Sequence, residues 1–349
     1  MISPPKNIGF FPAHPSQIWM MNALVPAFPD GINIHWVVRR KDCSEPLLRE
    51  LKIDDAVVID SGRGVVTNAI EFAGAVMRTI RETRRRNIDL WFSKYGAVNM
   101  AARLLGVRNV SFNDDDADIV PIIAKTSYPF ADRVLCLTET RMKGYEEQAI
   151  RYDSFHELYY LHPNRFSPDQ AVLERNQIDC RDPYCIIRLS ALTAHHDVGV
   201  GGVAEDLLDE ILAILSGKLR VYISSEKPLA EKYRPYGLSA GAADIHHLLA
   251  FAELLIGDSQ TMSAEAAVLG TPAIRISDFT GKLSYLNTLE SYGLITSFTP
   301  SNTGAILSLV RSLEFGARAK AEHRARREVM LKDKIDPVPW VVQQLLSLL

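Results

Sequence analysis

Short apolar runs alternate with longer amphipathic stretches along nearly the whole chain. This alternation is typical of βαβ units, in which parallel strands are joined by crossover helices. The runs contain little polar alternation, which favours a sheet covered by helices on both faces. The predicted strands are residues 7–11, 34–38, 56–59, 90–92, 107–112, 133–137, 184–189, 220–224, 254–256 and 273–276. The predicted helices are residues 18–28, 67–86, 97–105, 203–215, 245–252, 262–269, 317–334 and 340–349.

The strand pattern breaks once, near the middle of the chain. Residues 162–168 read His-Pro-Asn-Arg-Phe-Ser-Pro and are rich in turn formers. A chain of 349 residues also exceeds what one hydrophobic core usually holds. We therefore expect a Rossmann-like domain over 1–165, a second over 166–335, and a terminal helix over 336–349 that packs on the first. The two doubly wound domains would face each other across a cleft, with ligands at the carboxyl ends of the strands.

Charge and composition restrict the kinds of partner. The net charge of −3 gives no general surplus of cations, so we expect no nucleic acid partner. The four cysteines are scattered, and no apolar run is long enough for a signal peptide or a membrane helix. These features predict a cytoplasmic protein. Five arginines at 78, 81, 84, 85 and 86 are the local exception: they form either a solvated helix face or a basic surface for anionic lipid at the inner face of a membrane.

The segment 254–272 is the most informative, because it reads as strand, polar turn, short helix and glycine stop. Gly270 suits a left-handed C-terminal cap, and Pro272 prevents the helix from continuing. The hydroxyls of Ser259, Thr261 and Ser263 would surround the helix N-terminus, where free N–H groups favour an anion such as a diphosphate. The alternative is that these hydroxyls only cap the helix and that Glu265 lies in solvent.

Several pieces of the chain together resemble a known superfamily. They are Phe11-Pro12-Ala13-His14, Asn113-Asp114-Asp115-Asp116, Arg188-Leu189-Ser190 with His195-His196-Asp197, the stretch around Glu265, and residues 281–286, Gly-Lys-Leu-Ser-Tyr-Leu. The chain resembles GT-B proteins related to UDP-GlcNAc 2-epimerases and the UDP-GlcNAc transferase of peptidoglycan synthesis. It is most similar to a glycosyltransferase-like family classed as a numbered domain of unknown function.

The resemblance implies a nucleotide-sugar donor site in the second domain. In that interpretation Ser259, Gln260 and Thr261 meet the donor phosphates, and Glu265 meets the ribose. The usual superfamily turn has glycines where this chain has Ser259-Gln260. The polar residues after two other strands would add contacts to phosphate or base: Arg188, Ser190, Ser224 and the His195–Asp197 group.

Candidate catalytic residues follow strands of the first domain. His14 could remove a proton from an acceptor hydroxyl at neutral pH, or be a loop histidine held by local bonds. Asp114, Asp115 and Asp116 are alternative bases, or a solvated acidic loop. Lys94 could steady an anion or be exposed. No metal site is expected, since the helix N-terminus can stabilise a leaving diphosphate without one.

Three functions remain open on the sequence alone. The first is a metal-independent glycosyltransferase of polysaccharide biosynthesis, which moves a sugar from a UDP-sugar to a hydroxyl of a glycan or lipid-linked acceptor. The second is a sugar-nucleotide epimerase of the UDP-GlcNAc type. The third is a non-catalytic protein that binds a sugar nucleotide or a polysaccharide. A classical dehydrogenase or a P-loop NTPase is disfavoured, because neither glycine-rich fingerprint is present.

Overall fold

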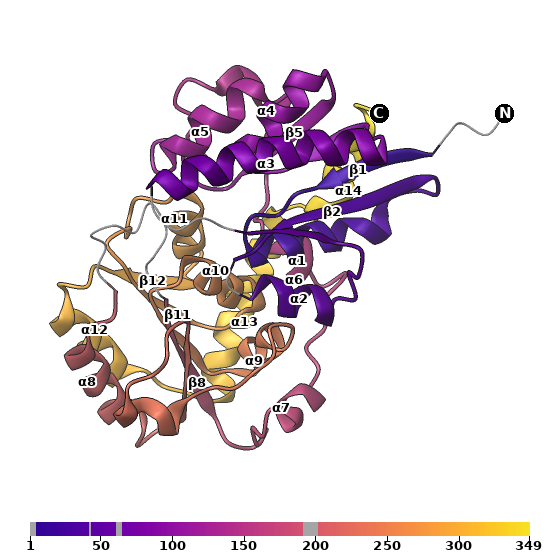
Figure 1. Cartoon of the computed structure of the whole chain (residues 1–349). Helices are drawn as coiled ribbons and strands as arrows, with labels where there is room; N and C mark the ends of the chain where they lie inside the picture. The colour runs from indigo at the N-terminus through magenta and orange to yellow at the C-terminus, as the bar shows by residue number, and fades with distance from the viewer. Residues whose placement is uncertain (1–4, 42, 61–64, 191–201) are drawn as a thin grey trace. The chain divides into compact units, whose positions relative to one another are not determined.

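The computed structural model describes residues 5–41, 43–60, 65–190 and 202–349. The chain splits into two compact units (Figure 1). The first unit comprises Met1–Tyr160 and Ile335–Leu349, and the second comprises Leu161–Lys334. The boundary predicted at 165 therefore falls inside the second unit, while the C-terminal segment groups with the first. In the part of the chain that the structure describes, no helix is long and apolar enough to cross a membrane.

The first unit is built on a parallel sheet of seven described strands in the order β3-β2-β1-β4-β5-β6-β7. The strands are β1 (Lys6–Phe10), β2 (Ile32–Arg39), β3 (Val57–Ile59), β4 (Leu90–Phe92), β5 (Arg108–Asn113), β6 (Arg133–Leu137) and β7 (Ala149–Tyr152). The order reverses between β1 and β4, which is the doubly wound arrangement. β4 is buried along its whole length, and the apolar residues of its neighbours β1 and β5 are buried as well, as continuous apolar runs require.

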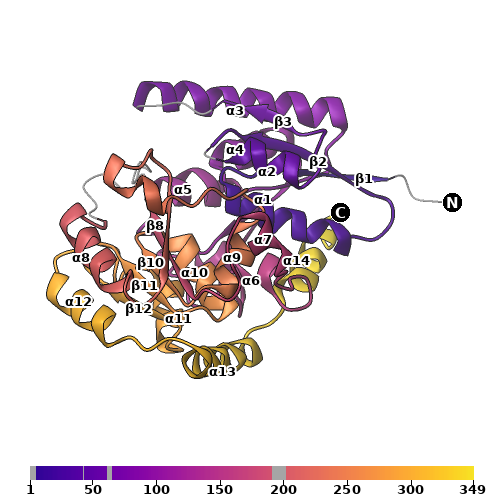
Figure 2. The same cartoon turned by 90° about the horizontal axis from the view of Figure 1, so that it is seen from below.

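Helices cover the first sheet on both sides, and the C-terminal helix α14 (Pro337–Leu346) packs against α1 (Pro15–Leu24) (Figure 2). Asp336 caps α14, because its side chain accepts a hydrogen bond from the backbone of Val338. The other helical segments of this unit are η1 (Val25–Ala27), α2 (Ser44–Glu50), α3 (Val65–Arg86), α4 (Gly96–Leu105), α5 (Pro121–Ser127), η2 (Tyr128–Phe130) and η3 (Glu146–Gln148), with α6 (Leu158–Leu161) at its boundary.

The second unit has a parallel sheet of five described strands in the order β12-β11-β10-β8-β9. The strands are β8 (Tyr184–Leu189), β9 (Arg220–Ser225), β10 (Leu254–Gly257), β11 (Ala273–Ile276) and β12 (Ile295–Phe298). The helices are α7 (Ala171–Arg175), α8 (Glu205–Leu215), η4 (Glu231–Tyr236), α9 (Ile245–Phe251), α10 (Gln260–Leu269), α11 (Ser284–Ser291), α12 (Thr303–Ser312) and α13 (Ala317–Asp333).

The strand order of the second unit reverses between β8 and β10, which makes this the position where ligands of such sheets bind. Gly257, at the end of β10, allows the two strands to approach closely. A side chain at this position would overlap with the carbonyl oxygen of Arg188 on β8. The prediction of two doubly wound, Rossmann-like α/β units is confirmed.

Two strands were not predicted, β7 and β12, and both lie at the edge of their sheet. An edge strand has one neighbour instead of two and is partly exposed, so its sequence is less apolar. Arg151 in β7 is exposed, as is Thr296 in β12. The two sequences, Ala-Ile-Arg-Tyr and Ile-Thr-Ser-Phe, therefore lack the continuous apolar run that marks the central strands.

Candidate functional site

The loops that follow three strands of the first unit bring four ionisable side chains together. Lys94 follows β4, Asp114 and Asp115 follow β5, and His156 follows β7. Nζ of Lys94 lies 3.1 Å from Oδ1 of Asp114 and 2.8 Å from Oδ2 of Asp115. Nδ1 of His156 lies 3.3 Å from Oδ2 of Asp114. We call these four residues the Asp–His–Lys cluster.

The charges in this cluster stabilise one another against the cost of burial. Burial alone would raise the pKa of Asp114, but His156 and Lys94 outweigh it and hold that pKa well below its usual value. Burial alone would lower the pKa of Lys94, but the two carboxylates outweigh it and raise that pKa. Lys94 is therefore a buried, ion-paired cation, and the interpretation that it is exposed was wrong.

One ring nitrogen of His156, Nε2, forms no hydrogen bond with the residues that the structure describes. The carboxylate of Asp114 faces Nδ1, so the tautomer that donates to Asp114 carries its proton on Nδ1 and has a lone pair on Nε2. Nε2 is buried and has no hydrogen-bond partner among the residues that the structure describes. The ring itself is held by edge contacts with Phe112 and Tyr159. A buried nitrogen with an unused lone pair is typical of a functional group.

Asp114, Asp115 and Asp116 have different surroundings, although they are adjacent in sequence. Asp116 is fully buried: Oδ1 accepts a hydrogen bond from the backbone of Arg141 at 2.7 Å, and Oδ2 lies 3.0 Å from its guanidinium. Asp116 thus ties the loop after β5 to the segment after β6. Asp114 and Asp115 turn toward Lys94. The interpretation of a solvated acidic loop was wrong, and the catalytic role of the three aspartates stays a prediction.

His14 caps helix α1. Its Nδ1 accepts a hydrogen bond from the backbone of Ser16 at 3.3 Å and lies 2.9 Å from the hydroxyl of Ser16. A neutral ring with an acceptor at Nδ1 carries its proton on Nε2. In that form Nε2 can donate a proton but cannot take one. The general-base role of His14 stays a prediction, and His156 has the geometry that better suits a base.

In the second unit, three of the predicted donor-binding residues lie together at the reversal point. Nη1 of Arg188 donates to the hydroxyl of Ser224 at 2.9 Å, and Nη2 lies 2.5 Å from Oε1 of Glu226. The backbone of Ser190 donates to Oδ1 of Asp258 at 2.7 Å. Asp258, whose pKa is raised by burial, thus links the end of β8 to the start of α10.

The first turn of α10 is organised by local hydrogen bonds. The side chain of Ser259 accepts from the backbone of Met262, and the hydroxyl of Ser263 donates to the carbonyl of Ser259. Ser259 is therefore the N-cap, as the helix-capping alternative predicted. Gln260 and Thr261 are half-buried in the same turn. Their contact with donor phosphates stays a prediction.

Glu265 is buried within the second unit. Its Oε1 lies 3.0 Å from Nε2 of His246 on α9, and the two side chains are only 6% and 3% exposed. The alternative that placed Glu265 in solvent was wrong. Its predicted contact with a ribose stays a prediction. His246 is the partner that only the tertiary structure shows, because α9 packs against α10.

Arg275 on β11 is a buried arginine that forms no ion pair with the residues that the structure describes. It is fully buried, and its Nε and Nη1 have no hydrogen-bond partner among the described residues. Burial lowers its pKa. Arg275 pairs in register with Gly257, which pairs with Arg188, so the two arginine side chains leave the same face of the sheet. Nε of Arg188 is also buried without a described partner.

Replacing Arg275 with methionine is expected to raise the free energy of unfolding by at least about 1 kcal/mol, because a desolvated charge is removed while most of the side-chain volume stays. Calorimetry of the variant and the wild type measures the difference. The matched control is Arg318→Met, because Arg318 is 90% exposed, and we expect a change within about 0.5 kcal/mol there. A loss of stability in Arg275→Met would show that the buried guanidinium stabilises the fold.

Three buried polar residues of these sites were not predicted from the sequence: His156, Asp258 and Arg275. His156 follows β7, and because that edge strand was not recognised, the polar residues after it were not considered. Asp258 and Arg275 lie in or beside strands whose burial was expected. His195, His196 and Asp197 lie outside the described residues. Within the described residues, no group of three or more His, Cys, Asp or Glu side chains is placed to hold a metal ion.

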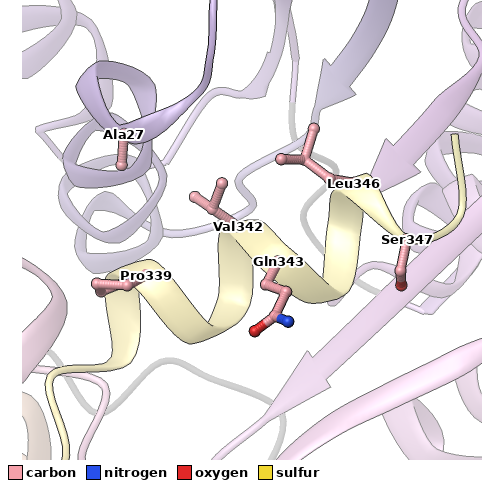
Figure 3. A pocket seen from close by; sticks show the side chains of 6 residues that line it. All are labelled: Ala27, Pro339, Val342, Gln343, Leu346 and Ser347. Carbon is pink, nitrogen blue, oxygen red and sulfur yellow. The ribbon is translucent and has the colours of Figure 1, made fainter.

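An apolar pocket lies beside α14 in the first unit (Figure 3). It is lined by Ala27, Pro339, Val342, Gln343, Leu346 and Ser347. None of these side chains can titrate, so the pocket offers no acid or base chemistry. We therefore take the Asp–His–Lys cluster of the first unit and the β8–α10 region of the second as the candidate sites.

No protein-family model matches the sequence, and no curated protein sequence does. Membership of the glycosyltransferase-like family that the resemblance implies therefore stays a prediction. Solved structures do match, over nearly the full length. MnaA from S. aureus in complex with UDP has a TM-score of 0.65 at 11% identity, covering 98% of this chain and 95% of that one.

Two further structures show the same likeness. UDP-GlcNAc 2-epimerase from Neisseria meningitidis bound to UDP-GlcNAc has a TM-score of 0.64 at 10% identity, covering 98% of this chain and 99% of that one. MurG from Acinetobacter baumannii has a TM-score of 0.56 at 15% identity, covering 98% of this chain and 100% of that one. At such identities the likeness shows the fold alone, and the chain has the GT-B fold.

Proposed function

We propose that this protein is a glycosyltransferase that uses a nucleotide sugar, with a UDP-sugar as the favoured donor. The acceptor is a hydroxyl group of a glycan or of a lipid-linked sugar, as in polysaccharide biosynthesis, and the reaction needs no metal ion. The observation that carries the proposal is the pairing of Asp114 with His156, which leaves a buried lone pair on Nε2.

In this proposal His156 is the general base. Nε2 takes the proton of the acceptor hydroxyl while the acceptor oxygen forms a bond to the anomeric carbon of the sugar. The bond between that carbon and the diphosphate oxygen breaks, and the nucleoside diphosphate leaves with the bonding electrons. The carboxylate of Asp114 stabilises the imidazolium that forms, as in other His–Asp pairs. Lys94 keeps Asp114 ionised and in place.

The donor would bind to the second unit, at the reversal point of its sheet. Arg188, Ser190 and Ser224 lie there, and α10 begins directly beyond Asp258. The ten-residue helix α10 directs its free N–H groups toward this point and would stabilise the charge on the leaving diphosphate. The solved structures that carry UDP or UDP-GlcNAc motivate the choice of uridine nucleotides as the first ligands to test.

Donor binding is tested by thermal shift with UDP-, GDP-, CMP- and dTDP-sugars. A ligand that binds only the folded state adds about 2.7 kcal/mol of stability at a hundredfold excess over its dissociation constant. We expect a clear shift with UDP-sugars that is reduced in Thr261→Ala. Ser301→Ala is the control, because Ser301 is exposed in the loop before α12. No shift with any nucleotide sugar would contradict the proposed donor site.

Turnover separates the proposed function from its alternatives. A transferase releases the nucleotide only when an acceptor is present. An epimerase changes the donor alone, or releases nucleotide without an acceptor, and that result would replace the proposal by the epimerase function. Binding without any turnover would instead favour a non-catalytic sugar-nucleotide or polysaccharide-binding protein.

A further inference from the structure

The most exposed large apolar side chains gather on three neighbouring helices of the first unit. Ile70 is 69% exposed and Met77 is 65% exposed, both on α3; Leu104 on α4 is 70% exposed, and Ile122 on α5 is 64% exposed. The other large apolar side chains that are exposed in the described part of the chain reach at most 53%. Helix α3 packs along α4, and α4 packs against α5 (Figures 1 and 2). We call the exposed side of these helices the α3–α5 surface.

On α3 the apolar and basic side chains share one face. Ile70, Met77, Arg81 and Arg84 are separated by seven, four and three residues, and such spacing places side chains on the same side of a helix. Ala73 and Gly74 lie in the same stripe and are exposed. The exposed face is therefore apolar in its first half and basic in its second half.

The charge of the α3–α5 surface is opposite in sign to that of the whole chain. The three helices carry the cations Arg78, Arg81, Arg84, Arg85, Arg86, Arg103 and Lys125, while their acidic residues are only Glu71 and Glu82. Both acidic side chains are almost completely buried. The side chain of Glu71 is 6% exposed and pairs with Arg39 at 2.6 Å, and that of Glu82 is 1% exposed and lies 3.3 Å from Arg86.

Several cations of this surface are not neutralised by any residue in the described part of the chain. Arg78, Arg81, Arg84, Arg103 and Lys125 have no ion-pair partner among the residues that the structure describes. The chain as a whole has a net charge of −3, so this concentration of cations is a local property. Unpaired cations beside exposed apolar side chains are the combination that binds the boundary between lipid headgroups and acyl chains.

We infer that the α3–α5 surface binds a membrane that carries anionic phospholipid. Ile70, Met77, Leu104 and Ile122 would enter the region of the acyl chains near the headgroups, and the arginines would contact lipid phosphates. An acidic protein or a nucleic acid would satisfy the arginines alone and would gain little from four exposed apolar side chains. The inference does not depend on the proposed function, because it uses no residue of the two candidate sites.

The test is sedimentation of the full chain with vesicles of phosphatidylcholine, alone or in an equimolar mixture with phosphatidylglycerol. We expect binding to the mixed vesicles only. Arg81→Gln/Arg84→Gln is expected to weaken binding about thirtyfold, since each of the two cations near such a surface contributes about 1 kcal/mol. Ile70→Ser/Met77→Ser is expected to weaken binding to a similar degree, because two buried apolar side chains are lost.

The matched control is Arg318→Gln/Arg324→Gln, two exposed arginines on α13, which should bind like the wild type. Circular dichroism checks that each variant is folded. Absence of wild-type binding to the anionic vesicles would overturn the inference, as would an equal loss in the control. Binding that the apolar variant leaves unchanged would also overturn it, because the apolar side chains would then not enter the membrane.

Discussion

Replacing His156 with glutamine is expected to lower kcat by about a factor of 10² to 10⁴, the usual contribution of a general base. Glutamine keeps a polar side chain of similar size but cannot take a proton at neutral pH. Because the donor would bind to the second unit, the thermal shift caused by the donor should stay as in the wild type. The KM for the donor should likewise change little, so the loss should lie in kcat.

The control for this variant is His35→Gln. His35 lies on β2 of the same unit, is half-buried and contacts Asn7 and Arg86, outside the Asp–His–Lys cluster. We expect its kcat to stay within a few-fold of the wild type. A His156→Gln enzyme that keeps its kcat would rule out His156 as the base.

Replacing Lys94 with methionine is expected to lower the free energy of unfolding of the first unit by about 3–5 kcal/mol. The methionine fills a similar volume but leaves the carboxylates of Asp114 and Asp115, which are only 18% and 20% exposed, without their cation. All four tryptophans, at 19, 36, 91 and 340, belong to the first unit, so their fluorescence in urea reports its unfolding selectively. Lys6→Met is the control, because its pair with Asp89 is 3.7 Å long and the lysine is 40% exposed.

The same cluster predicts how stability depends on acid pH. The pKa of Asp114 is lower in the folded protein than in the unfolded chain, so its contribution is complete above the unfolded value of about 3.9 and is lost as the pH falls through the folded value. In Asp114→Asn that contribution is absent at every pH. The difference in unfolding free energy from the wild type should therefore be constant between about pH 7 and 5, and shrink below about pH 4. A difference that does not change with pH would contradict the lowered pKa of Asp114.

The sequence by itself determined the fold class and most central strands. A continuous apolar run of a few residues is buried on both faces only in the middle of a parallel sheet that helices cover. The strands β4, β6, β8 and β11 were therefore predicted with the bounds that the structure shows. The N-cap Ser259 and the cap Gly270 could also be predicted, because capping depends on neighbouring residues. The edge strands β7 and β12 could not, since the polar residues Arg151 in β7 and Thr296 and Ser297 in β12 interrupt any such run.

The side-chain pairs were decided only by the tertiary structure. Lys94 forms an ion pair with Asp114, and Asp114 contacts His156, although the three residues lie in loops that follow three different strands. The spacing of these residues in the sequence does not predict the contacts, because the contacts depend on the order of the strands in the sheet and on the path of each loop. The same holds for Glu265 with His246, which meet because α9 packs on α10. The local periodicity of the sequence determines which face of a helix or strand is buried. Only the packing of elements that are distant in the sequence determines which charges are paired and that Nε2 of His156 keeps an unused lone pair.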